Sequence, residues 1–112
     1  MLVRFTFIQL PAFIRDCHRL ELEDDAVREI ESVILTNPNI GKVVTGTGAL
    51  RKMRFSPSGT GRGKSGAFRV LYACITRYQA VYFFAAYAKN EKENISAAEK
   101  RQFKKLLDEL KE

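Results

Sequence analysis

The chain has 112 residues, of which 46% are hydrophobic and 29% charged, and its formal net charge is +6. These values indicate one folded domain, residues 1–112, with enough apolar side chains for a hydrophobic core, and they exclude a disordered chain. No apolar run approaches the roughly 20 residues of a membrane-spanning helix, and the first residues lack a secretion-signal pattern, so we expect a cytoplasmic protein with no membrane partner.

The N-terminal segment is expected to form a strand and then a helix. Val3, Phe5 and Phe7 alternate with polar residues, which is the period of a half-buried strand. Pro11 has no N–H to leave unpaired in a first helical turn, so a helix is expected to begin there and to end near Leu20.

A second helix is expected between about residues 24 and 36. Asp24 or Asp25 is the predicted N-cap, and apolar residues follow at a period near 3.6. Asn37-Pro38 ends the pattern, because the residue before a proline disfavours helical angles. The short link between the two helices predicts an antiparallel helical hairpin.

After Gly41 the pattern changes to that of strands. A glycine-rich turn at 46–48 precedes a strand at 50–55, and a Gly/Ser loop separates this strand from two more at 67–75 and 80–88. The last two strands are almost continuously apolar, which predicts that they lie centrally in the sheet. Their connection is short enough for a hairpin, so these strands predict a three-stranded antiparallel meander.

The final segment is expected to form a helix. Ser96 and Glu99 have the spacing of a capping box. The apolar stripe that follows consists of Phe103, Leu106, Leu107 and Leu110. The element order is therefore β-α-α-β-β-β-α, an α+β domain with an N-terminal strand and helical hairpin, a meander and a C-terminal helix.

The sequence has too few suitably spaced cysteines and histidines to indicate a metal site or a redox site. Cys17 and Cys74 are far apart and form no CxxC pair, which indicates reduced packing residues. One histidine, His18, and two scattered thiols are too few ligands for a zinc site. We therefore expect no metal and no cofactor, and we expect His18 to be a helix residue without a catalytic role.

The charges are unevenly distributed along the chain. Residues 32–90 contain no aspartate or glutamate but nine lysines and arginines, so this window carries +9 while the remainder carries −3. Six of the nine bases lie between Arg51 and Arg69. An acid-free basic segment raises the local anion concentration and favours a polyphosphate partner. Nucleic acid is therefore the leading candidate partner.

Strand geometry sorts these bases onto two faces. On the strand at 50–55 a period of two places Arg51 with Met53 and Phe55 on the core face, and Lys52 with Arg54 on the other.

Symmetric closure of the glycine loop would pair this strand with the next one. Arg54 would then lie opposite Arg69, and Phe55 opposite Phe68, whereas a register slip of one residue would move Arg69 to the other face. Facing arginines repel each other, so a cluster of Lys52, Arg54 and Arg69 is explained if a phosphate lies between them.

The glycine loop at 59–66 contains Arg62 and Lys64. It lacks the spacing of a P-loop and no helix follows it, which argues against nucleotide binding. A basic, glycine-rich loop suits contact with a phosphate backbone, although it could equally be an ordinary surface loop. Tyr87 ends the last strand, where its ring could stack on a base.

Three segments resemble a known family: 48–54 (GALRKMR), 63–72 (GKSGAFRVLY) and 87–92 (YAKNEK). With the helical hairpin before them and the helix after them, they resemble the RelE/ParE superfamily of bacterial type II toxin–antitoxin toxins over nearly the whole chain. The basic glycine loop and the triplet Lys89-Asn90-Glu91 are most similar to the HigB branch.

The resemblance implies a ribosome-dependent endoribonuclease that cleaves mRNA in the decoding site, with the ribosome, mRNA and a cognate helix-turn-helix antitoxin as partners. By position, Lys52 and Arg54 match the two basic residues of the second strand, and Arg69 matches the arginine that opens the third. Asn90 stands where an arginine is usual and the expected C-terminal tyrosine is missing, with Ser96 roughly at its place.

Tyr87 or Lys89 could therefore substitute for the missing groups. The candidate catalytic residues are Lys52, Arg54, Arg69, Tyr87 and Lys89. The candidate RNA-binding residues are Arg51, Arg62, Lys64, Asn90 and Lys92.

The implied chemistry fits these side chains. Attack of a ribose 2′-hydroxyl on the adjacent phosphate requires a base, an acid and cationic stabilisation of the phosphorane. With no histidine in the cluster the base must be a lysine with a lowered pKa, and Lys52 lies between Arg54 and Arg69. The two arginines would hold the phosphate, while Arg62 and Lys64 would position the RNA.

Two other functions stay open at this point. A ParE-like gyrase poison shares the fold but not the RNA chemistry, and a non-catalytic RNA- or DNA-binding module could use the same basic face. The acid-free centre also suits an acidic or helical antitoxin.

Overall fold

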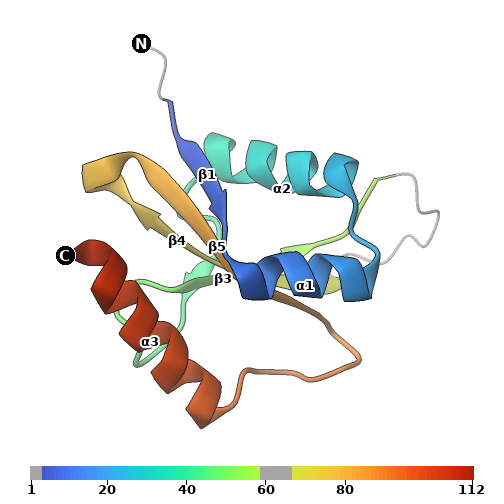
Figure 1. Cartoon of the computed structure of the whole chain (residues 1–112). Helices are drawn as coiled ribbons and strands as arrows, with labels where there is room; N and C mark the ends of the chain where they lie inside the picture. The colour runs from blue at the N-terminus through green and yellow to red at the C-terminus, as the bar shows by residue number, and fades with distance from the viewer. Residues whose placement is uncertain (1–3, 59–66) are drawn as a thin grey trace.

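The computed structural model describes residues 4–58 and 67–112, so Val3, Arg62 and Lys64 lie outside the described part. The described residues form a five-stranded sheet with the strand order β1-β5-β4-β3-β2 and three α-helices (Figure 1). This arrangement confirms the predicted α+β fold class. No helix within residues 4–58 and 67–112 is long and apolar enough to cross a membrane.

The N-terminal half follows the predicted order with small shifts. It consists of β1 (Thr6–Gln9), α1 (Pro11–Leu20) and α2 (Asp24–Thr36). Pro11 occupies the first turn of α1, as expected. The predicted cap of α2 is wrong, because the N-cap is Glu23 and makes no side-chain hydrogen bond, while Asp24 and Asp25 lie in the first turn. There their carboxylates interact favourably with the positive end of the helix dipole.

The meander is present and is extended at both edges. The remaining strands are β2 (Lys42–Val43), β3 (Arg51–Phe55), β4 (Phe68–Ile75) and β5 (Ala80–Ala88). Strands β3, β4 and β5 pair antiparallel, and β4 and β5 lie inside the sheet, as predicted. The sequence did not predict the two-residue strand β2 on β3 or the parallel pairing of β1 with β5. The first is a two-residue segment with little periodic signal, and the second joins segments that lie far apart in sequence.

The helices cover opposite faces of the sheet, which gives two cores. The hairpin core, under α1 and α2, includes Phe13 stacked on Phe83 with a centroid distance of 4.8 Å. The C-terminal core, under α3 (Ala97–Lys111), includes Phe84 in edge contact with Phe103 at 5.9 Å. Helix α3 begins at the predicted Ser96 capping box. Figure 1 shows α3 on the side of the sheet away from α1 and α2.

Side chains of α1 form hydrogen bonds with the part of the β5 edge that β1 does not cover. Strand β1 ends opposite Phe83. Beyond that point Asp16 accepts a hydrogen bond from the Ala86 N–H at 2.9 Å, and Arg19 donates to the Ala86 carbonyl at 3.2 Å. Arg19 also pairs with Asp16 at 3.0 Å and with Glu91, which follows β5. These contacts anchor α1 and the turn after β5 to the sheet.

Replacement of Asp16 by alanine is expected to lower the free energy of unfolding by about 1–3 kcal/mol, because the part-buried Ala86 N–H loses its acceptor. Urea unfolding at neutral pH measures the change. Asp108→Ala removes an exposed pair with Lys104 on α3 and is the control, with an expected change of at most about 0.5 kcal/mol. Equal effects of the two substitutions would contradict the anchoring role of Asp16.

Candidate functional site

Three bases meet on the face of the sheet that also carries α3. On β3, Met53 and Phe55 belong to the hairpin core, so Lys52 and Arg54 project from the opposite face. Arg54 pairs directly with Arg69 on β4, which confirms the register predicted from the sequence. We call Lys52, Arg54 and Arg69 the cation cluster.

Lys52 is held in place within the cation cluster. It is partly buried, and its Nζ donates a hydrogen bond to Oδ1 of Asn94 at 2.9 Å. Burial lowers the pKa of Lys52, and the positive charges of Arg69, Arg54 and Lys100 lower it further. An amine with a lowered pKa is more often neutral near physiological pH, and only the neutral form can accept a proton.

Opposite charges do not neutralise the two β3 members of the cluster. No ion pair between described residues of the chain includes Lys52 or Arg54. Arg54 lies directly across from Arg69, and two like charges at such a position repel each other. A phosphate placed between the two guanidinium groups would relieve this repulsion and accept forked hydrogen bonds.

Tyr87 lies beside the cation cluster but is buried. It pairs with Arg69 across β4 and β5, and only 2% of its surface is exposed. Its hydroxyl donates to the Glu93 carbonyl at 3.3 Å, while Lys92 Nζ lies 5.1 Å from the ring centroid. Burial raises the pKa of Tyr87, so the hydroxyl stays protonated. The ring therefore has no open face for the base stacking expected from the sequence.

The other candidates after β5 differ in exposure. Lys89 and Asn90 are exposed in the turn that follows the strand. Lys92 is partly buried, and its ammonium pairs with Glu99 at 2.8 Å as well as covering Tyr87. Lys92 thus fastens the connection between β5 and α3, so its charge is already engaged within the chain.

Arg51 lies on the other face of the sheet. It pairs with Tyr72, a residue of the hairpin core, and its guanidinium donates to the Gly41 carbonyl at 2.6 Å and the Asn39 carbonyl at 3.4 Å. Arg51 therefore lies on the opposite face of the sheet from the cation cluster, as strand alternation predicted, and its assignment as an RNA-binding residue stays a prediction. Strand alternation turns its side chain away, and backbone carbonyls of the loop before β2 take up its hydrogen bonds.

The sequence did not reveal two residues beside Lys52. Lys100 precedes Phe103 by three positions, so it extends the inward stripe of α3, and that spacing was a signal that could have found it. Asn94 lies in the connection before α3, where no periodic pattern places a side chain. Only the folded chain brings it to Lys52.

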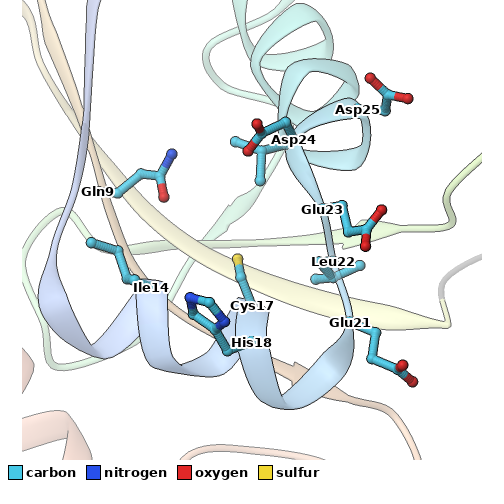
Figure 2. A pocket seen from close by; sticks show the side chains of 10 residues that line it. Gln9, Ile14, Cys17, His18, Glu21, Leu22, Glu23, Asp24 and Asp25 are labelled. Atoms are coloured by element: carbon cyan, nitrogen blue, oxygen red, sulfur yellow. The ribbon is translucent and has the colours of Figure 1, made fainter.

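A hollow of about 680 Å³ lies away from the cation cluster, between α1 and the start of α2 (Figure 2). Cys17 and His18 line it together with acidic residues of the α1–α2 link and of the first turn of α2, among them Glu23 and Asp24. Cys17 belongs to the hairpin core, and burial raises its thiol pKa to about 11. The acidic lining repels phosphate, so this hollow is a poor site for RNA.

The fold and the cation cluster define a class of small α+β domain that presents bases from adjacent strands beside a C-terminal helix. The family model described as "RelE toxin of RelE / RelB toxin-antitoxin system" matches residues 17–112. This match covers most of the chain, so the protein belongs to the RelE toxin family.

Solved structures share the fold at low sequence identity. A double arginine-to-alanine variant of the E. coli toxin RelE in the free state has 13% identity and a TM-score of 0.52, covering 80% of this chain and 87% of that one. A chain of the intact E. coli RelBE toxin–antitoxin complex has 14% identity and a TM-score of 0.52, with coverages of 74% and 94%. The conserved hypothetical protein HP0892 from Helicobacter pylori has 10% identity and a TM-score of 0.57, with coverages of 79% and 98%.

Proposed function

We propose that this protein is a ribosome-dependent endoribonuclease toxin that inhibits translation by cleaving mRNA in the decoding site. The observation that carries the proposal is the cation cluster, in which a lysine with a lowered pKa lies beside Arg54 and Arg69 on one face of the sheet. Membership of the RelE toxin family supports the same reading.

The chemistry requires only groups that the chain supplies. The neutral amine of Lys52 takes the proton of the ribose 2′-hydroxyl, whose oxygen attacks the adjacent phosphorus. Arg54 and Arg69 stabilise the negative charge of the phosphorane. The bond from phosphorus to the 5′-oxygen then breaks, and this oxygen takes a proton from Lys89 or from water. The products are a 2′,3′-cyclic phosphate and a free 5′-hydroxyl.

The geometry that the reaction requires supports dependence on the ribosome. In-line attack requires the 2′-oxygen, phosphorus and 5′-oxygen to be held in one geometry, which is worth several orders of magnitude in rate. The cation cluster supplies a base and positive charge, whereas mRNA held in a decoding site would supply that geometry.

The finer parts of the proposal concern partners. Cleavage on ribosomes places the protein in the cytoplasm, and the RelBE complex among its structural neighbours supports a cognate antitoxin. The helix-turn-helix type of that antitoxin and the HigB branch stay predictions from sequence. So do RNA contacts of Arg62 and Lys64, which lie outside the described residues.

Primer extension on cellular mRNA after induction of the protein tests the function. Cuts in translated regions at fixed positions within codons are expected, and purified protein should reproduce them on mRNA-programmed ribosomes but not on naked mRNA. DNA damage without mRNA cuts would indicate a gyrase poison. Tight RNA or DNA binding with neither effect would indicate a non-catalytic module.

A further inference from the structure

The connection between β5 and α3 reaches across the sheet to the cation cluster. Asn94 is 42 residues from Lys52 in sequence, yet its Oδ1 accepts a hydrogen bond from Lys52 Nζ at 2.9 Å. This is the one hydrogen bond of the Lys52 side chain that the structure gives within residues 4–58 and 67–112. A single acceptor therefore sets the direction of the amine.

The backbone on both sides of Asn94 is fastened. Before it, the Glu93 carbonyl accepts the hydrogen bond of the buried Tyr87 hydroxyl. After it, Ile95 is buried in the C-terminal core, and Ser96 forms the capping box of α3. Asn94 itself is exposed, so its side chain contributes little to packing. A residue held between two anchors, with its amide turned to a functional lysine, fits a positioning role.

We propose that Asn94 is a positioning residue, which orients the amine of Lys52 toward the scissile ribose through the hydrogen bond between Oδ1 and Nζ. The inference rests on the proposed function and deepens it. A neutral lysine amine has two N–H groups and one lone pair. Donation of one N–H to Asn94 restricts rotation about the Cε–Nζ bond, and the lone pair is then held in a limited range of directions.

The amide of Asn94 has an advantage that a carboxylate would lack. A neutral oxygen orients the amine while adding no negative charge, so the burial and positive neighbours that lower the pKa of Lys52 keep their effect. An aspartate at this position would offer a similar shape but would stabilise the ammonium form and raise the pKa. An uncharged hydrogen-bond acceptor at position 94 is therefore part of the proposed site.

Asn94→Asp and Asn94→Ala test the proposal through opposite shifts. The aspartate should raise the pKa of Lys52 by about 1–3 units, because an opposite charge within hydrogen-bond distance favours the ammonium. The alanine should lower the pKa, since the ammonium loses an acceptor. NMR titration of the lysine side-chain carbons measures both directly in the free protein. The Lys52→Arg variant lacks this lysine, so the NMR signal that is missing from its spectrum is assigned to Lys52.

Cleavage on programmed ribosomes gives the second measurement. Below the pKa of the base the rate falls about tenfold for each unit by which that pKa rises, so Asn94→Asp should lose about 10–10³-fold at neutral pH and recover as pH increases. Asn94→Ala should instead lower the rate on the high-pH plateau, where the amine is neutral in both proteins, because its amine is unoriented. Gln102→Glu, which adds the same charge on the exposed side of α3, should leave the profile unchanged.

The outcomes separate this inference from the proposed function. A folded Asn94→Asp variant with an unshifted Lys52 pKa would overturn the inference, as would a shifted pKa with an unshifted cleavage profile. If both Asn94 variants shift the pKa of Lys52 in the same direction, the role of Asn94 is purely structural and the inference is also overturned. If the pKa values shift oppositely but the wild-type protein cuts no mRNA, the contact between Asn94 and Lys52 stands and the proposed function fails.

Discussion

Replacement of Lys52 by arginine is expected to reduce mRNA cleavage by about 10²–10⁴-fold, the contribution typical of a general base. Arginine keeps the positive charge and a long side chain, but its guanidinium does not lose a proton in proteins. The substitution therefore removes the base function while the electrostatic contribution to the cluster persists. Single-turnover cleavage on programmed ribosomes, with the protein in excess, measures the loss.

The pH dependence of the wild-type protein follows from the same residue. Because the pKa of Lys52 is lowered, the neutral amine is scarce below that pKa and abundant above it. Cleavage should rise with pH and level off once the lowered pKa is passed, and it should level off below pH 10.5, the ordinary value for lysine.

Lys105→Arg on the exposed surface of α3 is the control for Lys52→Arg and should cleave like the wild type. Retention of full activity by Lys52→Arg would show that this position supplies only positive charge. The proton acceptor would then have to be another group or water.

The pairing of the bases could be predicted because it depends on local features. Strands β3 and β4 are joined by one loop, and the strand period is two, so Phe55 opposite Phe68 fixes Arg54 opposite Arg69. The same alternation placed Arg51 with the core face. The structure places it there, away from the cation cluster, so an RNA contact of Arg51 stays a prediction.

The surroundings of the cluster depend on contacts that a local pattern does not encode. The parallel pairing of β1 with β5 joins segments more than 70 residues apart. A pairing irregularity between Leu71 and Tyr72 leaves Phe84 unmatched on β5, so Phe84 and Ala85 both belong to the C-terminal core. For the same reason the sequence did not predict that the chain leading into α3 buries Tyr87, or that Asn94 contacts Lys52.

Arg54→Gln is expected to decrease cleavage by about 10²–10³-fold, the cost of removing one group that stabilises transition-state charge. The same change should leave the fold as stable or more stable, by a few tenths to about 1 kcal/mol, because it removes the repulsion with Arg69 across the strands. Cleavage on ribosomes and urea unfolding measure the two quantities. Lower activity with equal or higher stability indicates a residue placed for an anion and not for the fold.

Arg51→Gln is the matched control, three positions away on β3 and on the opposite face. Its guanidinium donates to the Gly41 carbonyl at 2.6 Å, so its loss should lower the free energy of unfolding by about 1–2 kcal/mol. The folded protein should still cleave mRNA at the wild-type rate, because Arg51 does not reach the cation cluster. Loss of Arg54 should thus lower activity without lowering stability, whereas loss of Arg51 should lower stability without lowering activity. If Arg54→Gln unfolded the protein and Arg51→Gln abolished cleavage, the functional face of the sheet would be the one that carries α1 and α2.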